Sequence, residues 1–318
     1  MLPHNFAQPI YCIVGPTASG KTALSIALAK ALGGVEQAEI ISADAMQLYR
    51  GMDIGTAKIT ASEMCGIRHH QLDVLNVRDE ASVAKYQESA RADLAQIVQN
   101  GKIPIIVGGS GLYVSALLDE LEFPGTDENI RKELNEIWES FGLDPLISEL
   151  REKDPVSAAK INLANPRRVI RALEVVRLTG KSYTPVFPRH TAHYSNVVQI
   201  GVRVEKEILH ERILHRTEKM FATGLLTETE NLLSQGLREA STASKATGYA
   251  QSIAVIDNEI SIDEAIANTA FATRRLAKKQ RTWFGADPRI NWFDFSNKER
   301  SAHENAIRYA IEQILAKV

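Results

Sequence analysis

The sequence predicts an α/β fold in which a parallel sheet is flanked by helices and interrupted by an inserted helical domain. Three observations lead to this prediction. Short apolar runs that suit buried strands recur along the chain, each followed by helical periodicity. A glycine-rich loop joins the first run to the first helix. Strand signals vanish and later return, which predicts a core of residues 1–121 and 195–318 and an insertion of residues 122–194.

Composition describes an ordinary globular protein and excludes several classes. The 318 residues are 44% hydrophobic and 24% charged, with a formal net charge of −2, so bulk charge gives no sign of a nucleic-acid partner. The two cysteines make no disulfide framework. The first apolar run spans about five residues, too short for a signal peptide, and no run could span a bilayer. We therefore expect a cytoplasmic protein without a membrane partner.

The glycine-rich loop fits the P-loop spacing, in which glycine, four residues and Gly-Lys-Ser/Thr follow a strand and open a helix. Its residues are Gly15, Pro16, Thr17, Ala18, Ser19, Gly20, Lys21 and Thr22. Successive backbone N–H groups and a helix N-terminus favour a polyphosphate, with Lys21 reaching the terminal phosphates and the Thr22 hydroxyl binding Mg²⁺. The motif leaves open whether the ligand is ATP, another nucleotide or a diphosphate that is not a nucleotide.

The second and third strands bring further polar groups to the same edge of the sheet. Residues 38–44 form a short apolar run that ends at Asp44, and a long loop through Lys58 follows it. Residues 103–107 form a third run that leads into Gly108, Gly109 and Ser110. Since the carboxyl ends of parallel strands line the ligand crevice, we expect Asp44 and Ser110 near the phosphate loop. Between these strands we predict a loop at His69-His70 and a helix over residues 81–99.

The insertion carries a local excess of positive charge. Residues 165–177 predict a helix with proline near its first turn, on which Arg167, Arg168 and Arg171 share one face. Residues 151–189 hold nine basic and three acidic side chains, with Arg189 as the last basic one. A charge run usually marks a solvated face, but this excess in a chain of net charge −2 favours a polyanion partner.

The remainder of the chain returns to the core. We predict strands at residues 196–204 and 290–293, and helices at residues 206–224 and 263–284. The first of these helices carries Arg216, a cation suited to a phosphate, although a plain surface helix has the same composition. The second ends in basic residues beside Trp283, which suits a phosphate backbone with a stacking partner.

Taken together, these motifs resemble bacterial tRNA dimethylallyltransferases, also called tRNA isopentenyltransferases. The resemblance spans Ile13 to about Phe284. Its most specific part is the segment from Asp44 to Lys58, which generic P-loop kinases do not carry. The other segments that carry it are Gly15–Thr22, Val107–Tyr113, Arg167–Val175, Thr247–Tyr249 and Lys278–Phe284. Ser110 stands where many members have threonine, which keeps the hydroxyl.

The resemblance implies transfer of a dimethylallyl group from dimethylallyl diphosphate to N6 of adenosine 37, in tRNAs that read codons starting with U. The product would be N6-dimethylallyladenosine. The resemblance also implies Mg²⁺, a monomer with no obligate protein partner, and an insertion that clasps the anticodon stem-loop. A label of ATP binding would rest only on the shape of the P-loop, because this reaction needs no ATP.

The resemblance assigns roles residue by residue. Asp44 would be the general base, with Thr17 and Arg216 as further catalytic residues, and Gly15–Thr22 would hold the diphosphate. The positions that would contact tRNA are Asp44, Ala45, Met46, Gln47, Ser110, Arg131, Arg167, Arg168, Val169, Ile170, Arg171, Lys245, Ala246, Thr247, Gly248, Tyr249 and Ala250.

Three alternatives share part of this pattern. An ATP-dependent small-molecule kinase would use the P-loop and Asp44, but it leaves the loop from Asp44 to Lys58 and the insertion unexplained. An isopentenyltransferase for free adenine nucleotides would need no basic insertion. A nucleotide-switched RNA-binding module would need no carboxylate beside the P-loop.

Overall fold

The computed structural model describes residue 6 and residues 8–183, 190–297 and 299–316. Arg189 therefore lies outside the described residues. The chain separates into two compact units, one made of Met1–Asp119 with His190–Val318 and the other of Glu120–Arg189. We refer to them below as the core unit and the inserted unit, and each is described by itself.

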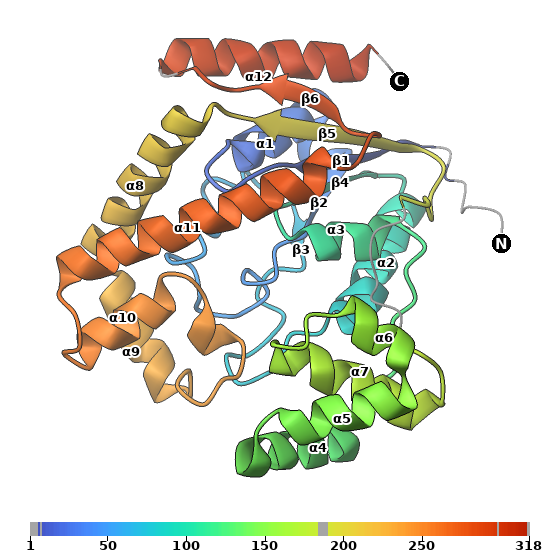
Figure 1. The fold of residues 1–318 in the computed structure, drawn as a ribbon. Coiled ribbons are helices and arrows are strands. Elements are labelled where there is room, and N and C mark those ends of the chain that lie inside the picture. The colour runs from blue at the N-terminus through green and yellow to red at the C-terminus, as the bar shows by residue number, and fades with distance from the viewer. Residues whose placement is uncertain (1–5, 7, 184–189, 298, 317–318) are drawn as a thin grey trace. The chain divides into compact units, whose positions relative to one another are not determined.

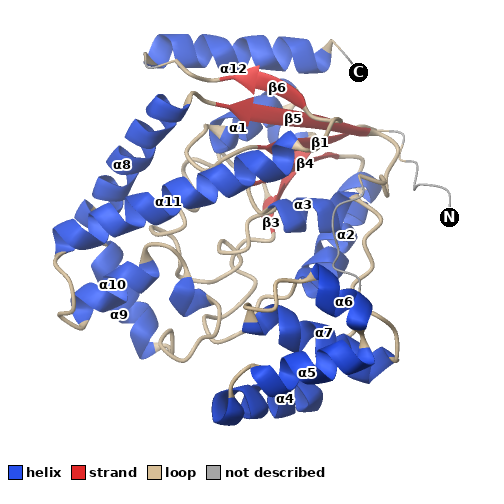
Figure 2. Ribbon diagram, viewed as in Figure 1, coloured by secondary structure: helices blue, strands red, loops and turns tan. Residues whose placement is uncertain are grey.

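One parallel sheet organises the core unit, as the sequence predicts (Figure 2). Within the described residues it has six strands in the order β3-β2-β4-β1-β5-β6, and every neighbouring pair is parallel. The strands are β1 (Ile10–Val14), β2 (Ala38–Ser42), β3 (His69–His70), β4 (Ile103–Gly108), β5 (Val197–Arg203) and β6 (Asn291–Asp294). Five of them match the predicted apolar runs. The loop predicted at His69-His70 is wrong, because these residues pair with β2 at the edge of the sheet.

Helices cover both faces of the sheet (Figure 1). Alternate residues of β1 point to opposite faces, so Tyr11 and Ile13 join one apolar cluster and Cys12 joins the other. The first cluster includes α1 (Lys21–Ala31) and α12 (Arg300–Leu315). The second includes α2 (Val83–Gln99) and α3 (Gly111–Leu118). The core is therefore double-layered, with the sheet in its middle.

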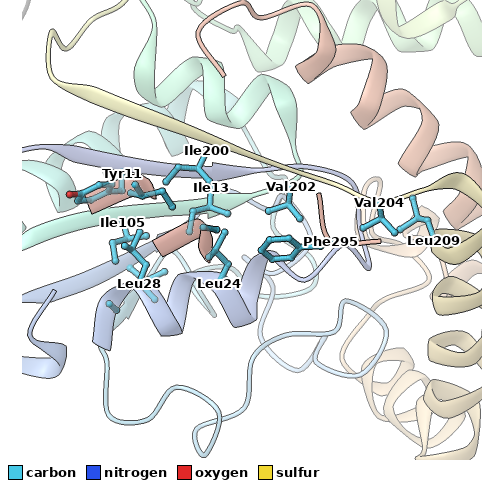
Figure 3. Close-up of a cluster of buried hydrophobic side chains, with 14 of the residues drawn as sticks. Tyr11, Ile13, Leu24, Leu28, Ile105, Ile200, Val202, Val204, Leu209 and Phe295 are labelled. Atoms are coloured by element: carbon cyan, nitrogen blue, oxygen red, sulfur yellow. The ribbon is translucent and has the colours of Figure 1, made fainter. Parts of the chain in front are cut away.

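Figure 3 shows the buried side chains of the first cluster, which come from the sheet and the helices packed on it. Leu24 and Leu28 of α1 contact Ile13 and Ile105 of the sheet, and all four side chains are fully buried. Shortening such a side chain to alanine costs about 2–5 kcal/mol of the free energy of unfolding. The strand ends that border this cluster therefore provide a fixed platform for the loops that follow them.

The remaining elements of the core unit are helical. They are η1 (Gly34–Glu36), α8 (Lys206–Ala222), α9 (Leu225–Ser234), η2 (Ala243–Lys245), α10 (Tyr249–Ile256) and α11 (Ile262–Gly285). The predicted helices at 206–224 and 263–284 correspond to α8 and α11, which pack against each other. None of the helices in the described part of the chain is long and apolar enough to cross a membrane.

The inserted unit is helical and has a core of its own. It consists of α4 (Glu128–Phe141), α5 (Asp144–Lys153), α6 (Pro155–Lys160) and α7 (Pro166–Thr179). Asn165 caps α7 by accepting a hydrogen bond from the backbone N–H of Arg168, and Pro166 occupies the first turn as expected. Leu134, Leu150 and Val169 are fully buried in a single apolar cluster. The unit therefore has an apolar core that is separate from the two clusters at the sheet.

The two ends of the insertion leave the core unit at one place. Asp119 forms an antiparallel bridge with Ala192, and the N–H of His193 donates to the carbonyl of Leu118 at 2.8 Å. Arg289 binds the Asp119 carboxylate at 2.6 Å. The chain is thus fastened to the core immediately before and after the inserted unit.

Candidate functional site

The sheet topology predicts a ligand crevice beside β1. The chain runs from β1 into α1 on one face of the sheet and from β4 into α3 on the other face. Because β1 and β4 are neighbours, the loops after them lead to opposite faces of the sheet, and ligands of α/β proteins bind at such a point. The glycine-rich loop and the segment from Gly108 to Ser110 both lie there.

The glycine-rich loop presents a row of backbone donors. Ala18 adopts a left-handed conformation at φ 62°, which turns successive N–H groups toward one side. Among the described residues, the N–H groups of residues 18–23 bind no acceptor except within the start of α1. The buried hydroxyl of Ser19 also lacks a partner there. A row of backbone N–H groups at the N-terminus of a helix is an arrangement that favours an anion.

Two cations accompany this loop, and neither contacts a carboxylate among the residues that the structure describes. The Lys21 amine donates to the carbonyl of Pro16 at 2.7 Å, and Arg216 donates to the Thr17 hydroxyl at 2.6 Å. Burial lowers the pKa of Lys21 to about 8, with Asp44 opposing this shift and Arg216 adding to it. Burial likewise lowers the pKa of Arg216, and Asp44 opposes it. Both cations are therefore poorly solvated and lie in the electrostatic field of Asp44.

Asp44 follows β2 directly and opens the second loop of the site. Its carboxylate accepts the N–H of Met46 at 3.0 Å and remains half-buried. The next N–H, that of Ala45, donates to the Ser110 hydroxyl at 3.1 Å. The structure thus brings Asp44 and Ser110 together, although they lie far apart in sequence. Gln47 accepts from the Ser42 hydroxyl at 3.1 Å, which fixes its amide beside the end of β2.

Lys58 anchors the far end of the loop that begins at Asp44. Its buried amine contacts the carboxylates of Asp53 and Asp73, each at 2.6 Å, and the carbonyl of Tyr49 at 2.7 Å. Sequence reasoning included Lys58 in the resemblance but gave it no role. The signal that was available is a single lysine five positions after Asp53 in the same loop.

Glu228 of α9 holds the middle of the same loop. Its carboxylate accepts backbone N–H groups from Asp53, Ile54 and Gly55 at 2.8–3.3 Å and the hydroxyl of Tyr249 at 2.5 Å. Burial and this carboxylate raise the pKa of Tyr249. The Tyr249 side chain is fully buried and so supports the loop from inside. The role of Glu228 is not visible from the sequence, because its backbone partners lie 173–175 positions away.

The segment expected at the RNA is therefore mostly covered. Ala246, Gly248 and Tyr249 are buried, and only Lys245 of the segment from Lys245 to Ala250 is fully exposed. Similarly, Trp283 packs against Gly111, where an added Cβ would lie 2.3 Å from the indole. Trp283 is thus half-buried in the core unit, and its role as a stacking partner for RNA stays a prediction.

The arginines of the inserted unit have carboxylate partners inside that unit. Arg131 and Arg171 contact the buried carboxylate of Glu174 at 2.9 and 2.7 Å. Arg171 also donates to the carbonyls of residues 124 and 125. The side chains of Val169 and Ile170 are buried in the apolar cluster of this unit. Arg167 and Arg168 are exposed. The predicted basic face is thus divided between structural and exposed arginines.

Comparison with known proteins agrees with this geometry. A model of the family described as IPP transferase matches residues 47–287. The tRNA dimethylallyltransferase of Paenarthrobacter aurescens is 51% identical over 292 residues, which cover 92% of each chain. The full-length tRNA isopentenylpyrophosphate transferase of Bacillus halodurans is 39% identical, with a TM-score of 0.66 over 97% of this chain and 98% of that one.

A third comparison concerns the fold alone. The structure of a eukaryotic dimethylallyltransferase acting on tRNA has a TM-score of 0.78 and 24% identity, over 96% of this chain and 80% of that one. The family model covers most of the chain, and the bacterial relatives cover nearly all of it. From the site and these matches we conclude that the chain belongs to the IPP transferase family.

Proposed function

We propose that this chain is a tRNA dimethylallyltransferase, which transfers a dimethylallyl group from dimethylallyl diphosphate to N6 of adenosine 37 in tRNAs that read codons starting with U. The names of its relatives support a tRNA-modifying prenyltransferase. The observation that carries the proposal is the arrangement of Asp44 in the field of Lys21 and Arg216, beside unpaired backbone donors.

The glycine-rich loop would hold the diphosphate of the donor. The N–H groups of residues 18–23 offer hydrogen bonds, and Lys21 and Arg216 offer positive charge that no carboxylate neutralises within the described residues. As the C–O bond breaks, the diphosphate leaves with the electron pair and gains negative charge. Donors that are already oriented in a poorly solvated site stabilise that charge most effectively.

Thr22 would bind the Mg²⁺ that we expect with the diphosphate. Its side chain is exposed in the first turn of α1, beside the backbone donors. A single hydroxyl suits Mg²⁺, which usually takes one or two protein ligands and completes its shell with phosphate oxygens and water. When bound, the ion would neutralise part of the charge on the leaving diphosphate.

Asp44 would act on the acceptor. In the proposed step the lone pair of the adenine N6 forms a bond to the allylic carbon, and the nitrogen then releases one proton. A half-buried carboxylate at the end of β2 can orient the amine and accept that proton, which contributes typically about 10²–10⁴-fold. Because the acceptor base is stacked in the anticodon loop, it must turn outward to reach this crevice.

The tRNA would be bound by exposed cations outside the crevice. Arg167, Arg168 and Lys245 are exposed in this structure and suit contacts with phosphates. For Arg131 and Arg171, which bind Glu174, a contact with RNA would have to be shared with that carboxylate. The cytoplasmic location and the monomeric state expected from the resemblance belong to the same proposal.

The test is mass spectrometry of nucleosides from a tRNA transcript incubated with dimethylallyl diphosphate, Mg²⁺ and the protein. We expect one dimethylallyl group on an adenosine. Asp44→Asn, which keeps the shape of the side chain, should bind the tRNA and give no modified nucleoside. ATP consumption with a phosphorylated product would support a kinase instead, and modification of AMP but not tRNA would support a transferase for free nucleotides.

A further inference from the structure

The side chain of Gln280 connects the two loops of the site. Gln280 lies on α11 and is 8% exposed. Its Oε1 accepts the backbone N–H of Thr17 at 2.8 Å, and its Nε2 donates to the carbonyl of Gly109 at 3.0 Å. Because an N–H can only donate and a carbonyl can only accept, the two partners fix the orientation of the amide.

The contact leaves no spare room. A Cβ added to Gly109 would lie 2.4 Å from Nε2 of Gln280, closer than real Cβ atoms come to other heavy atoms. Only glycine therefore allows the loop after β4 to approach the amide so closely. The close approach shows that α11 and this loop are packed directly against each other at Gln280.

Each partner of Gln280 is next to a group of the proposed reaction. On one side, the Thr17 hydroxyl accepts from Arg216, which also feels the charge of Asp44. On the other side, Ser110 follows Gly109 and accepts the N–H of Ala45, the residue after Asp44. One amide thus lies between the loop that would hold the diphosphate and the loop that would hold the acceptor.

We propose that Gln280 is a positioning residue, which holds the glycine-rich loop and the loop after β4 at the separation that the transfer step needs. The proposal rests on the proposed function. Gln280 touches none of the reacting atoms and acts through Thr17 and Gly109. A displacement of about 1 Å in such a site can lower the rate by about 10²-fold, because the attacking and leaving atoms lose their alignment.

Gln280→Glu tests the proposal with a change of one group. The carboxylate keeps the shape of the amide and can still accept from Thr17, but it offers no proton to Gly109. At pH 8 we expect kcat at saturating donor to fall by about 10²-fold, while KM for tRNA stays within about twofold. As pH falls, the buried carboxyl takes up a proton and can donate to Gly109 again. The ratio of wild-type to variant kcat should therefore shrink toward one.

Gln280→Met is the matched comparison, since it has similar size and no hydrogen-bonding group. Its loss of kcat should be independent of pH, and thermal melting of both variants reports whether they fold. Wild-type kcat in Gln280→Met would reduce Gln280 to a packing role, and a loss in Gln280→Glu that does not shrink as pH falls would overturn the role of the bond to Gly109. A change confined to KM for tRNA would overturn the proposal in favour of an RNA contact.

A second measurement separates this proposal from the proposed function. Binding of inorganic pyrophosphate with Mg²⁺, followed by calorimetry, needs no transfer step. We expect Gln280→Glu to weaken this binding at pH 8 and to recover it as pH falls, with no such recovery in Gln280→Met. If the wild type bound pyrophosphate in this way but modified no tRNA, the proposed function would fail and the role of Gln280 in ordering the loop would stand. Unchanged binding and unchanged kcat in Gln280→Glu would overturn the role itself.

Discussion

The cations of the glycine-rich loop and the arginines of the inserted unit differ in what neutralises them. Lys21 and Arg216 bind neutral oxygens, a carbonyl and a hydroxyl. Arg131 and Arg171 share the buried carboxylate of Glu174. The inserted unit has the denser run of basic residues. Yet the two cations that contact no carboxylate among the described residues, Lys21 and Arg216, lie in the core unit. The number of basic residues in a segment therefore says less about polyanion binding than their partners do.

The largest expected effect comes from removing an unneutralised cation. Lys21→Met should lower kcat/KM for dimethylallyl diphosphate by about 100- to 1,000-fold, because a buried donor that faces the leaving group is lost. Steady-state kinetics with tRNA in excess measure it. Lys30→Met, on the exposed end of the same helix, should leave kcat/KM unchanged. A loss below tenfold for Lys21→Met would mean that its partners in the loop already satisfy the amine.

The next largest effect comes from removing Glu174, the carboxylate that neutralises Arg131 and Arg171. Glu174→Ala should lower the free energy of unfolding of the inserted unit by about 3 kcal/mol, because two partly buried arginines lose their carboxylate. Urea unfolding monitored by circular dichroism measures it. Glu152→Ala, an exposed change in the same unit, should stay within about 0.5 kcal/mol. If both variants had the same free energy of unfolding, the ion pairs of Arg131 and Arg171 with Glu174 would stabilise the unit no more than exposed ion pairs do.

His70 extends the comparison to a cation between two carboxylates in the core unit. It contacts Glu39 at 2.7 Å and Asp93 at 3.3 Å, while Lys102 also binds Glu39. Burial alone would lower the pKa of His70, but contacts with Asp93 and Glu39 raise it above its ordinary value. Folding thus favours the charged form, so this stabilisation is present below the ordinary pKa and is lost as pH rises through the higher folded-state pKa.

The expected loss at alkaline pH is about 1.5 kcal/mol, as for hydrogen bonds to charged groups. Urea unfolding at a series of pH values measures it. In His70→Gln this part of the pH dependence should disappear, whereas the exposed His215→Gln should keep it. A wild-type profile that rises through the same pH range would contradict the raised pKa.

The smallest effect separates two arginines of one helix. Arg168→Ala should weaken tRNA binding several-fold and reduce the slope of log K against log salt by about 0.7–0.9, the value for one phosphate contact. Arg168→Lys should keep the slope. Arg171→Ala should instead lower the stability of the inserted unit with little change in slope. If the Arg171 variant lost slope and the Arg168 variant did not, the division into structural and exposed arginines would be reversed.

Much of the core could be predicted because its signals are local. Five strands are apolar runs of four to seven residues, and the glycine-rich loop has a fixed spacing that places Thr17, Lys21 and Thr22 without any tertiary information. Asp44 could be placed because it follows such a run directly. By contrast, β3 is two histidines whose strand character comes only from pairing with β2, so no apolar pattern marks it.

The connections between loops could not be predicted because their partners are distant. Gln280 is one glutamine in a basic helix, and its bonds to Thr17 and Gly109 cross 263 and 171 positions. The partner of Arg171 is different, since Glu174 lies three positions along the same helix, a spacing at which side chains meet. That pair could be predicted from the sequence. It shows that acidic residues three or four positions from a basic one should be considered before a charged helix is assigned to a polyanion.

The bridge between Asp119 and Ala192 holds together the two points at which the chain leaves the core unit and returns to it. Since the core brings the two ends together, the sheet would keep its connectivity if a short turn replaced all the residues between them. Each doubling of the length of a flexible loop adds only about 0.6 kcal/mol to the entropic cost of bringing its ends together. The size and surface of the insertion can therefore change while the strand order of the core sheet stays the same.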